Sequence, residues 1–123
     1  MAAGLMEYIA HADAPFEWSR TDCTCFMAGW CARHFGFDPI ADLRGTYATQ
    51  AEADAITGGD LSAFLGLRMT RLRTKSAADR GDVAVVSLLG QKIAAIAAPP
   101  FWVVKSPIRV AWVRATPVRI WGR

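Results

Sequence analysis

Apolar residues in the first half of the chain recur at intervals of three and four, the spacing of helices that bury one face. Residues that cap helices precede several of these stretches and glycines follow them. Thr49-Gln50-Ala51-Glu52, for example, has the form of a capping box, and Gly58-Gly59 would end the helix that it opens. The pattern predicts helices over residues 3–11, 22–34, 38–43, 49–57 and 60–65.

The second half changes to short β-branched or aromatic runs that turn residues separate. These runs predict strands over residues 82–86, 93–97, 101–104, 108–113 and 118–121. Helices followed by strands favour an α+β fold, in which N-terminal helices pack on one side of a C-terminal antiparallel sheet. With 123 residues and no linker or repeat, we expect one domain over residues 1–123, helical over 1–66 and strand-rich over 67–123.

The charges are divided between the two halves of the chain. Residues 1–66 hold three arginines against nine acidic residues, a net charge of −6, and residues 67–123 hold eleven cations against two acids, a net charge of +9. The basic run from Arg68 to Arg80 is interpreted as a solvated face that pairs with the acidic half, or as a docking surface for an acidic partner. Nucleic acid is the weaker alternative, because no aromatic residues alternate with these cations.

Several features bear on the cellular location. No apolar run reaches the roughly 18 residues of a membrane span, and the first residues include Glu7 without a basic segment, so neither a span nor a signal peptide is expected. The three cysteines are crowded into residues 23–31, which favours reduced thiols over a disulfide framework. We therefore expect a soluble protein made in the bacterial cytoplasm.

Cys23 is the main candidate for chemistry. It lies where a loop turns into the helix predicted over 22–34, and the unpaired amides of a helix start favour a thiolate. The alternative is a small buried residue at a helix start, a common environment for free cysteine. Asp22 is expected to cap the helix, and Cys25 projects about 200° around the helix from Cys23.

Asp22-Cys23-Thr24-Cys25-Phe26 resembles the signature of NlpC-type, papain-like cell-wall amidases, and Arg80-Gly81-Asp82-Val83 resembles the Gly-Asp pair that opens their first long strand. The chain is more closely similar to a small phage- and prophage-encoded family of undetermined function. The shared motifs comprise Trp18 with Asp22-Cys23, Gly36 with Asp38-Pro39, Arg44-Gly45 with Tyr47, the Gly-Asp-Val strand and the closing Trp121. Ser19 replaces the glycine that often follows the tryptophan in that family.

The resemblance implies a compact NlpC-like fold with Cys23 as the catalytic residue, and a phage setting, often near tail genes. It also implies a histidine at the start of the strand that follows the Gly-Asp strand. That region reads Gly90-Gln91-Lys92-Ile93 and contains no imidazole.

Other bases are weaker candidates. His34 would lie about 16 Å along the same helix from Cys23, out of reach. His11 precedes a loop that returns toward Cys23 and stays open, although a solvated residue at a helix end is the plainer interpretation. Lys92 would need strong desolvation to act as a base.

A metal site is a further alternative. Cys31 and His34 could share a helix face as two zinc ligands, but with Met27 and Trp30 they are more typical of a core stripe. We therefore predict no metal and no cofactor.

Two functions remain open. The favoured hypothesis is a phage tail-associated structural or assembly protein on a degenerate cysteine-amidase scaffold, whose partners are other tail or virion proteins and whose final location is the virion tail. The alternative is an active cysteine peptidase or amidase, in which Cys23 attacks cell-wall peptides and an unidentified base moves the proton.

Overall fold

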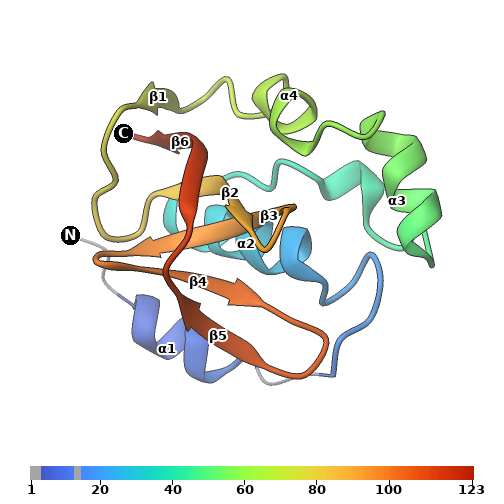
Figure 1. Cartoon of the computed structure of the whole chain (residues 1–123), viewed down its shortest axis with the longest axis horizontal. Coiled ribbons are helices and arrows are strands. Elements are labelled where there is room, and N and C mark those ends of the chain that lie inside the picture. The colour runs from blue at the N-terminus through green and yellow to red at the C-terminus, as the bar shows by residue number, and fades with distance from the viewer. Residues whose placement is uncertain (1–3, 13–14) are drawn as a thin grey trace.

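Helices precede a curled sheet in this protein, as a computed structural model that describes residues 4–12 and 15–123 shows (Figure 1). The helices are α1 (Leu5–Ala10), α2 (Cys23–His34), the 3₁₀ turn η1 (Ala41–Leu43), α3 (Gln50–Thr57) and α4 (Leu61–Gly66). Asp22, Thr49 and Asp60 cap α2, α3 and α4 by accepting a hydrogen bond from a backbone N–H in the first turn. The start of the helix predicted over 3–11 lies outside the described residues, and the described helix begins at Leu5.

All six strands of the sheet run antiparallel to their neighbours. They are β1 (Arg73–Lys75), β2 (Val83–Leu88), β3 (Gln91–Ala98), β4 (Phe101–Lys105), β5 (Val110–Val113) and β6 (Thr116–Gly122), and their order is β1-β6-β2-β3-β4-β5. The predicted α+β fold, with N-terminal helices and a C-terminal antiparallel sheet, is confirmed. The sequence pattern missed β1, because this three-residue strand lies inside the basic run and has no apolar alternation.

The sheet curls, so both of its faces are buried. Only two residues join β5 to β6, yet β6 pairs with β2, on the far side of β3 and β4 (Figure 1). One face packs against the helices, and the other encloses a second apolar cluster that includes Val86, Trp102 and Ile120. Four successive residues of β2, Val83–Val86, are therefore fully buried, which explains why this strand is a continuous apolar run.

Helix α2 fixes the position of the candidate site. Phe26, Met27 and Trp30 on its inner face are buried against the sheet, and Trp30 Nε1 donates a hydrogen bond of 2.8 Å to the carbonyl oxygen of Gly81. Burial of each large apolar side chain contributes about 1.5–3 kcal/mol, so α2 is held firmly on β3 and β4. None of the helices in residues 4–12 and 15–123 is long and apolar enough to cross a membrane.

Candidate functional site

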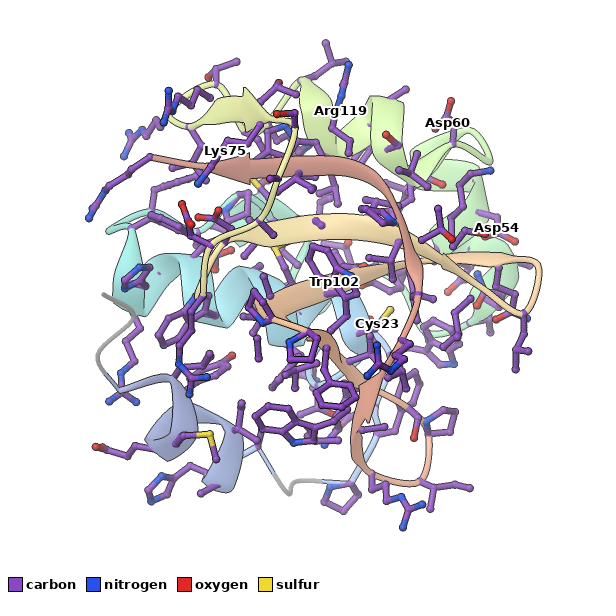
Figure 2. All side chains as sticks on the ribbon, turned by 60° about the vertical axis from the view of Figure 1, so that its left-hand side comes forward. Cys23, Asp54, Asp60, Lys75, Trp102 and Arg119 are labelled. Carbon is purple, nitrogen blue, oxygen red and sulfur yellow. The ribbon has the colours of Figure 1, made fainter. Side chains whose placement is uncertain are left out.

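Cys23 is the first residue of α2 and lines a groove with a volume of about 810 Å³. One wall of the groove comes from α3 and α4, and the other comes from the β2–β3 and β4–β5 turns. Phe16, Trp18 and Ile93 contribute apolar lining, while Gln50, Asp54 and Lys92 contribute polar groups. Figure 2 shows Cys23 near the middle of the molecule, with Asp54 and Asp60 together at one side.

The environment of the Cys23 thiol disfavours its ionised form. Burial is the main cause that raises the pKa of the Cys23 thiol, and the neighbouring negative charge of Asp22 raises it further. The backbone N–H of Ala94 and the Thr24 hydroxyl, 4.0 Å from the sulfur, oppose this change only in part. The helix start alone predicted a favoured thiolate, but burial and the adjacent carboxylate outweigh that effect.

Asp22 does more than cap α2. Its Oδ1 accepts a 2.9 Å hydrogen bond from the Cys25 N–H, which confirms the predicted cap. Its Oδ2 accepts a 2.7 Å bond from the Ser19 N–H and a 2.6 Å bond from the Tyr47 hydroxyl. The carboxylate is almost fully buried, and these three donors compensate for its desolvation. Burial and the hydrogen bond to Asp22 also raise the pKa of Tyr47.

A second pair of polar residues extends this network. Arg44 Nε lies 2.7 Å from Asp38 Oδ2, and Arg44 Nη2 donates a 3.4 Å bond to the Cys25 carbonyl oxygen. Asp38 Oδ1 in turn accepts a 3.0 Å bond from the Ile40 N–H. The motifs around Asp22, Asp38 and Arg44 thus meet behind the turn that carries Cys23. Sequence reasoning treated them as separate signatures and assigned no role to Arg44 or Tyr47, although their polar character between apolar helices was a signal.

Ser19 occupies a backbone conformation that favours glycine. Its φ angle is +62°, in the left-handed region, and its side chain is buried. This conformation turns the Ser19 N–H toward the Asp22 carboxylate. A glycine would adopt this conformation without the steric cost that a serine meets there.

Neither histidine lines the groove. His11 is exposed at the end of α1, and its Nδ1 lies 2.8 Å from the carbonyl oxygen of Glu7. His34 is the last residue of α2, at the opposite end from Cys23, and its ring stacks on Trp30 with 4.7 Å between centroids. Burial and then the nearby Arg123 lower the pKa of His34.

Lys92 lines the groove together with Gln91 and Ile93, at the start of β3, where the resemblance implies an imidazole. It is exposed, and because side chains alternate along a strand it shares a face with Ala94, whose N–H approaches the Cys23 sulfur. The groove therefore holds a thiol and an exposed ammonium group, with no imidazole along its described lining.

The other two cysteines, Cys25 and Cys31, are buried in the core. Cys31 is buried with its Sγ 3.6 Å from Met27 Sδ, consistent with the core stripe, and burial raises its pKa to about 12. Cys23, Cys25 and Cys31 are free thiols. Within the described ranges, no three His, Cys, Asp or Glu residues gather as metal ligands.

Asp82, from the Gly-Asp pair that opens β2, lies in a separate ion-pair cluster. Its Oδ2 accepts a 2.6 Å bond from Lys75 Nζ and a 2.8 Å bond from the Asp79 N–H. These bonds fasten the edge strand β1 to the start of β2, which is a structural role away from the groove.

Comparison with known proteins gives the family but no function. No curated protein and no solved structure matches the chain. A family model described as a domain of unknown function, DUF6950, matches residues 2–122, and the chain therefore belongs to that family.

Proposed function

We propose that this protein is a phage tail-associated structural or assembly protein built on a degenerate cysteine-amidase scaffold. It is made in the bacterial cytoplasm and acts by holding a segment of another tail or virion protein. The observation that carries the proposal is the state of Cys23: the thiol lines the groove, its pKa is raised, and no imidazole lies along the described lining. A protonated thiol without a base is a poor nucleophile.

The groove itself is suited to binding. Its lining combines apolar side chains with a few polar groups on opposite walls, the composition by which pockets orient a ligand. The hydrogen bonds to Asp22 and the bond between Arg44 and Asp38 hold the Cys23 turn rigid, so the groove is largely formed before a partner arrives.

Alkylation of the thiols as a function of pH tests this proposal. Iodoacetamide is added over a range of pH to the full chain, and mass spectrometry follows each cysteine separately. We expect Cys23 to react slowly at and below neutral pH, since the thiolate is the reactive form. Cys31 is the internal control for a buried thiol. Selective labelling of Cys23 at acidic pH would contradict the proposal.

A phage that encodes this chain provides the biological test. Cys23→Ser preserves the size of the side chain and removes the thiol, so a binding protein should retain full infectivity and a hydrolase should lose it. Mass spectrometry of purified virions should detect the chain in particles. A loss of infectivity with normal particle assembly would overturn the scaffold proposal.

A specific observation keeps cysteine hydrolysis as the second candidate. The Cys23 sulfur lies at the start of α2 beside the Ala94 N–H and faces a groove that could hold a peptide. The thiol would attack the amide carbonyl, a base from a neighbouring subunit would carry its proton to the leaving amine, and water would then hydrolyse the resulting thioester. Incubation of cell-wall peptides with the wild type and with Cys23→Ala distinguishes the candidates, because only a hydrolase yields cleavage that depends on Cys23.

A further inference from the structure

The helix α3 and the start of α4 form an acidic end of the molecule, defined by Glu52, Asp54 and Asp60; Lys92 and Arg119 border it, since they line a pocket together with Asp60. All three side chains are exposed, and α3 buries none of its residues. Each carboxylate accepts one hydrogen bond: Glu52 from the Ala48 N–H, Asp54 from the side-chain amide of Gln50, and Asp60 from the Ala63 N–H. None of the three forms a salt bridge with a lysine or arginine within the described part of the chain.

Four arginines form a basic end around β1 and the end of β6. These arginines are Arg71, Arg73, Arg80 and Arg123. All four are exposed, and within residues 4–12 and 15–123 none of them forms a salt bridge. The guanidinium groups of Arg71 and Arg123 lie over the rings of Phe37 and Phe35, at 5.5 Å and 5.3 Å from the centroids. By contrast Arg68 and Lys75, in the same basic run, are paired with Asp42 and with Asp79 and Asp82. Local pairing therefore accounts for part of the run, and within the described residues these four arginines form no salt bridge.

The two ends lie apart along the long axis of the molecule. Figure 1 places α3 at one extreme of this axis and β1 with the C-terminus toward the other. Figure 2, turned by 60°, again separates Asp54 and Asp60 from Lys75 of β1. The charges of one end therefore do not reach those of the other within one chain, but they can meet across two chains.

We propose that copies of this chain associate head to tail, with the acidic end of one copy docked on the basic end of the next. Three carboxylates face four guanidinium groups, and such complementary potentials both steer an encounter and orient it. A second copy is favoured over an unrelated acidic partner because the chain itself carries both surfaces. Since the two surfaces differ, the contact is heterologous and repeats from copy to copy, closing a ring or extending a filament.

Sedimentation velocity on the full chain tests the proposal. The Debye length falls from about 30 Å at 0.01 M salt to about 3 Å at 1 M, so the wild type should associate at low salt and dissociate at high salt. Two variants neutralise one end each: Ala51→Lys with Asp54→Lys, and Arg73→Glu with Arg80→Glu. These positions are exposed, and the capping residues Glu52 and Asp60 stay in place. Each variant alone should bind itself at least tenfold more weakly at low salt.

A mixture of the two variants is the decisive measurement. One variant then keeps only its basic end and the other keeps only its acidic end, so an equimolar mixture should form 1:1 complexes that neither variant forms alone. Arg109→Glu with Arg114→Glu is the matched control, because it changes the net charge by the same amount beside β5 and should self-associate like the wild type. The proposal is overturned if the wild type stays monomeric at low salt, if the control weakens association as much as Arg73→Glu with Arg80→Glu, or if the mixture stays monomeric.

Discussion

Replacement of Tyr47 by phenylalanine removes one hydroxyl from the network behind Cys23. That hydroxyl donates a 2.6 Å bond to the Asp22 carboxylate, which is buried and also caps α2. Tyr8→Phe is the matched control, because the Tyr8 hydroxyl donates a bond of the same 2.6 Å length to the neutral carbonyl oxygen of Phe26. The two variants lose the same atom and differ in the charge of the acceptor.

The acceptor sets the expected magnitude. A hydrogen bond to a charged group contributes about 1.5–3 kcal/mol and one to a neutral group about 0.5–1.5 kcal/mol, so Tyr47→Phe should cost more than Tyr8→Phe. For a domain of this length, each kcal/mol lowers Tm by about 4 °C. Asp22→Ala should cost about 3–5 kcal/mol, because the cap is lost and both Ser19 N–H and Tyr47 hydroxyl lose their acceptor.

Urea unfolding monitored by tryptophan fluorescence measures these free energies, with an unchanged m-value as the check that the unfolded states remain comparable. If the network is responsible, Tyr47→Phe should cost almost nothing more in a protein that already carries Asp22→Ala. The reasoning is refuted if Tyr47→Phe costs no more than Tyr8→Phe, or if its cost persists without the Asp22 carboxylate.

Three further predictions concern packing, backbone strain and pH. A Cβ at Gly29 of α2 would collide with the Tyr8 hydroxyl, so Gly29→Ala should be neutral or destabilising in the wild type. In a protein that already carries Tyr8→Phe, the same substitution should stabilise the fold by up to about 1 kcal/mol. Thermal unfolding of the wild type, the two single variants and the double variant measures this difference. Ser19→Gly and Leu89→Asn should each raise the free energy of unfolding by up to about 1 kcal/mol, because both residues have a positive φ that glycine and asparagine adopt more readily. A loss of stability in denaturant titrations would show that the backbone at these two positions is not strained. Burial raises the pKa of Cys31 in the folded protein to about 12. The protonated thiol therefore contributes its full stabilisation below the pKa of Cys31 in the unfolded chain, and this contribution is lost as pH rises from there toward about 12. Cys31→Ala should therefore flatten the fall of stability between about pH 9 and about pH 11, by at most about 1.4 kcal/mol per pH unit, and an unchanged slope would exclude this cause.

The helices were predictable because their signals are local. Asp22, Thr49 and Asp60 cap the helices that the sequence assigned to them, since a cap needs only a side chain and the next few amides. Most strands were predictable from their apolar runs. The edge strand β1 was not, because it joins the sheet through its pairing with β6, which is distant from it in the sequence.

The candidate site was predictable in part. The sequence placed Cys23 at a helix start and His34 out of its reach, and both positions follow from helix geometry alone. The contact between Tyr47 and Asp22 was not predictable, because 25 residues separate them and only the packing of the intervening turn brings them together. The raised pKa of the Cys23 thiol was missed for the same reason, since burial depends on what the sheet places against the sulfur.

By itself, then, the sequence determined most of the helical and extended segments, where the caps lie and how the charge divides between the halves. These properties depend on neighbouring residues and on composition. Tertiary structure alone decided that the sheet curls to bury both faces, that Asp22, Asp38 and Arg44 meet in one network, and that Cys23 is desolvated beside a carboxylate. Those outcomes depend on contacts between distant segments, and such contacts exist only once the chain has packed.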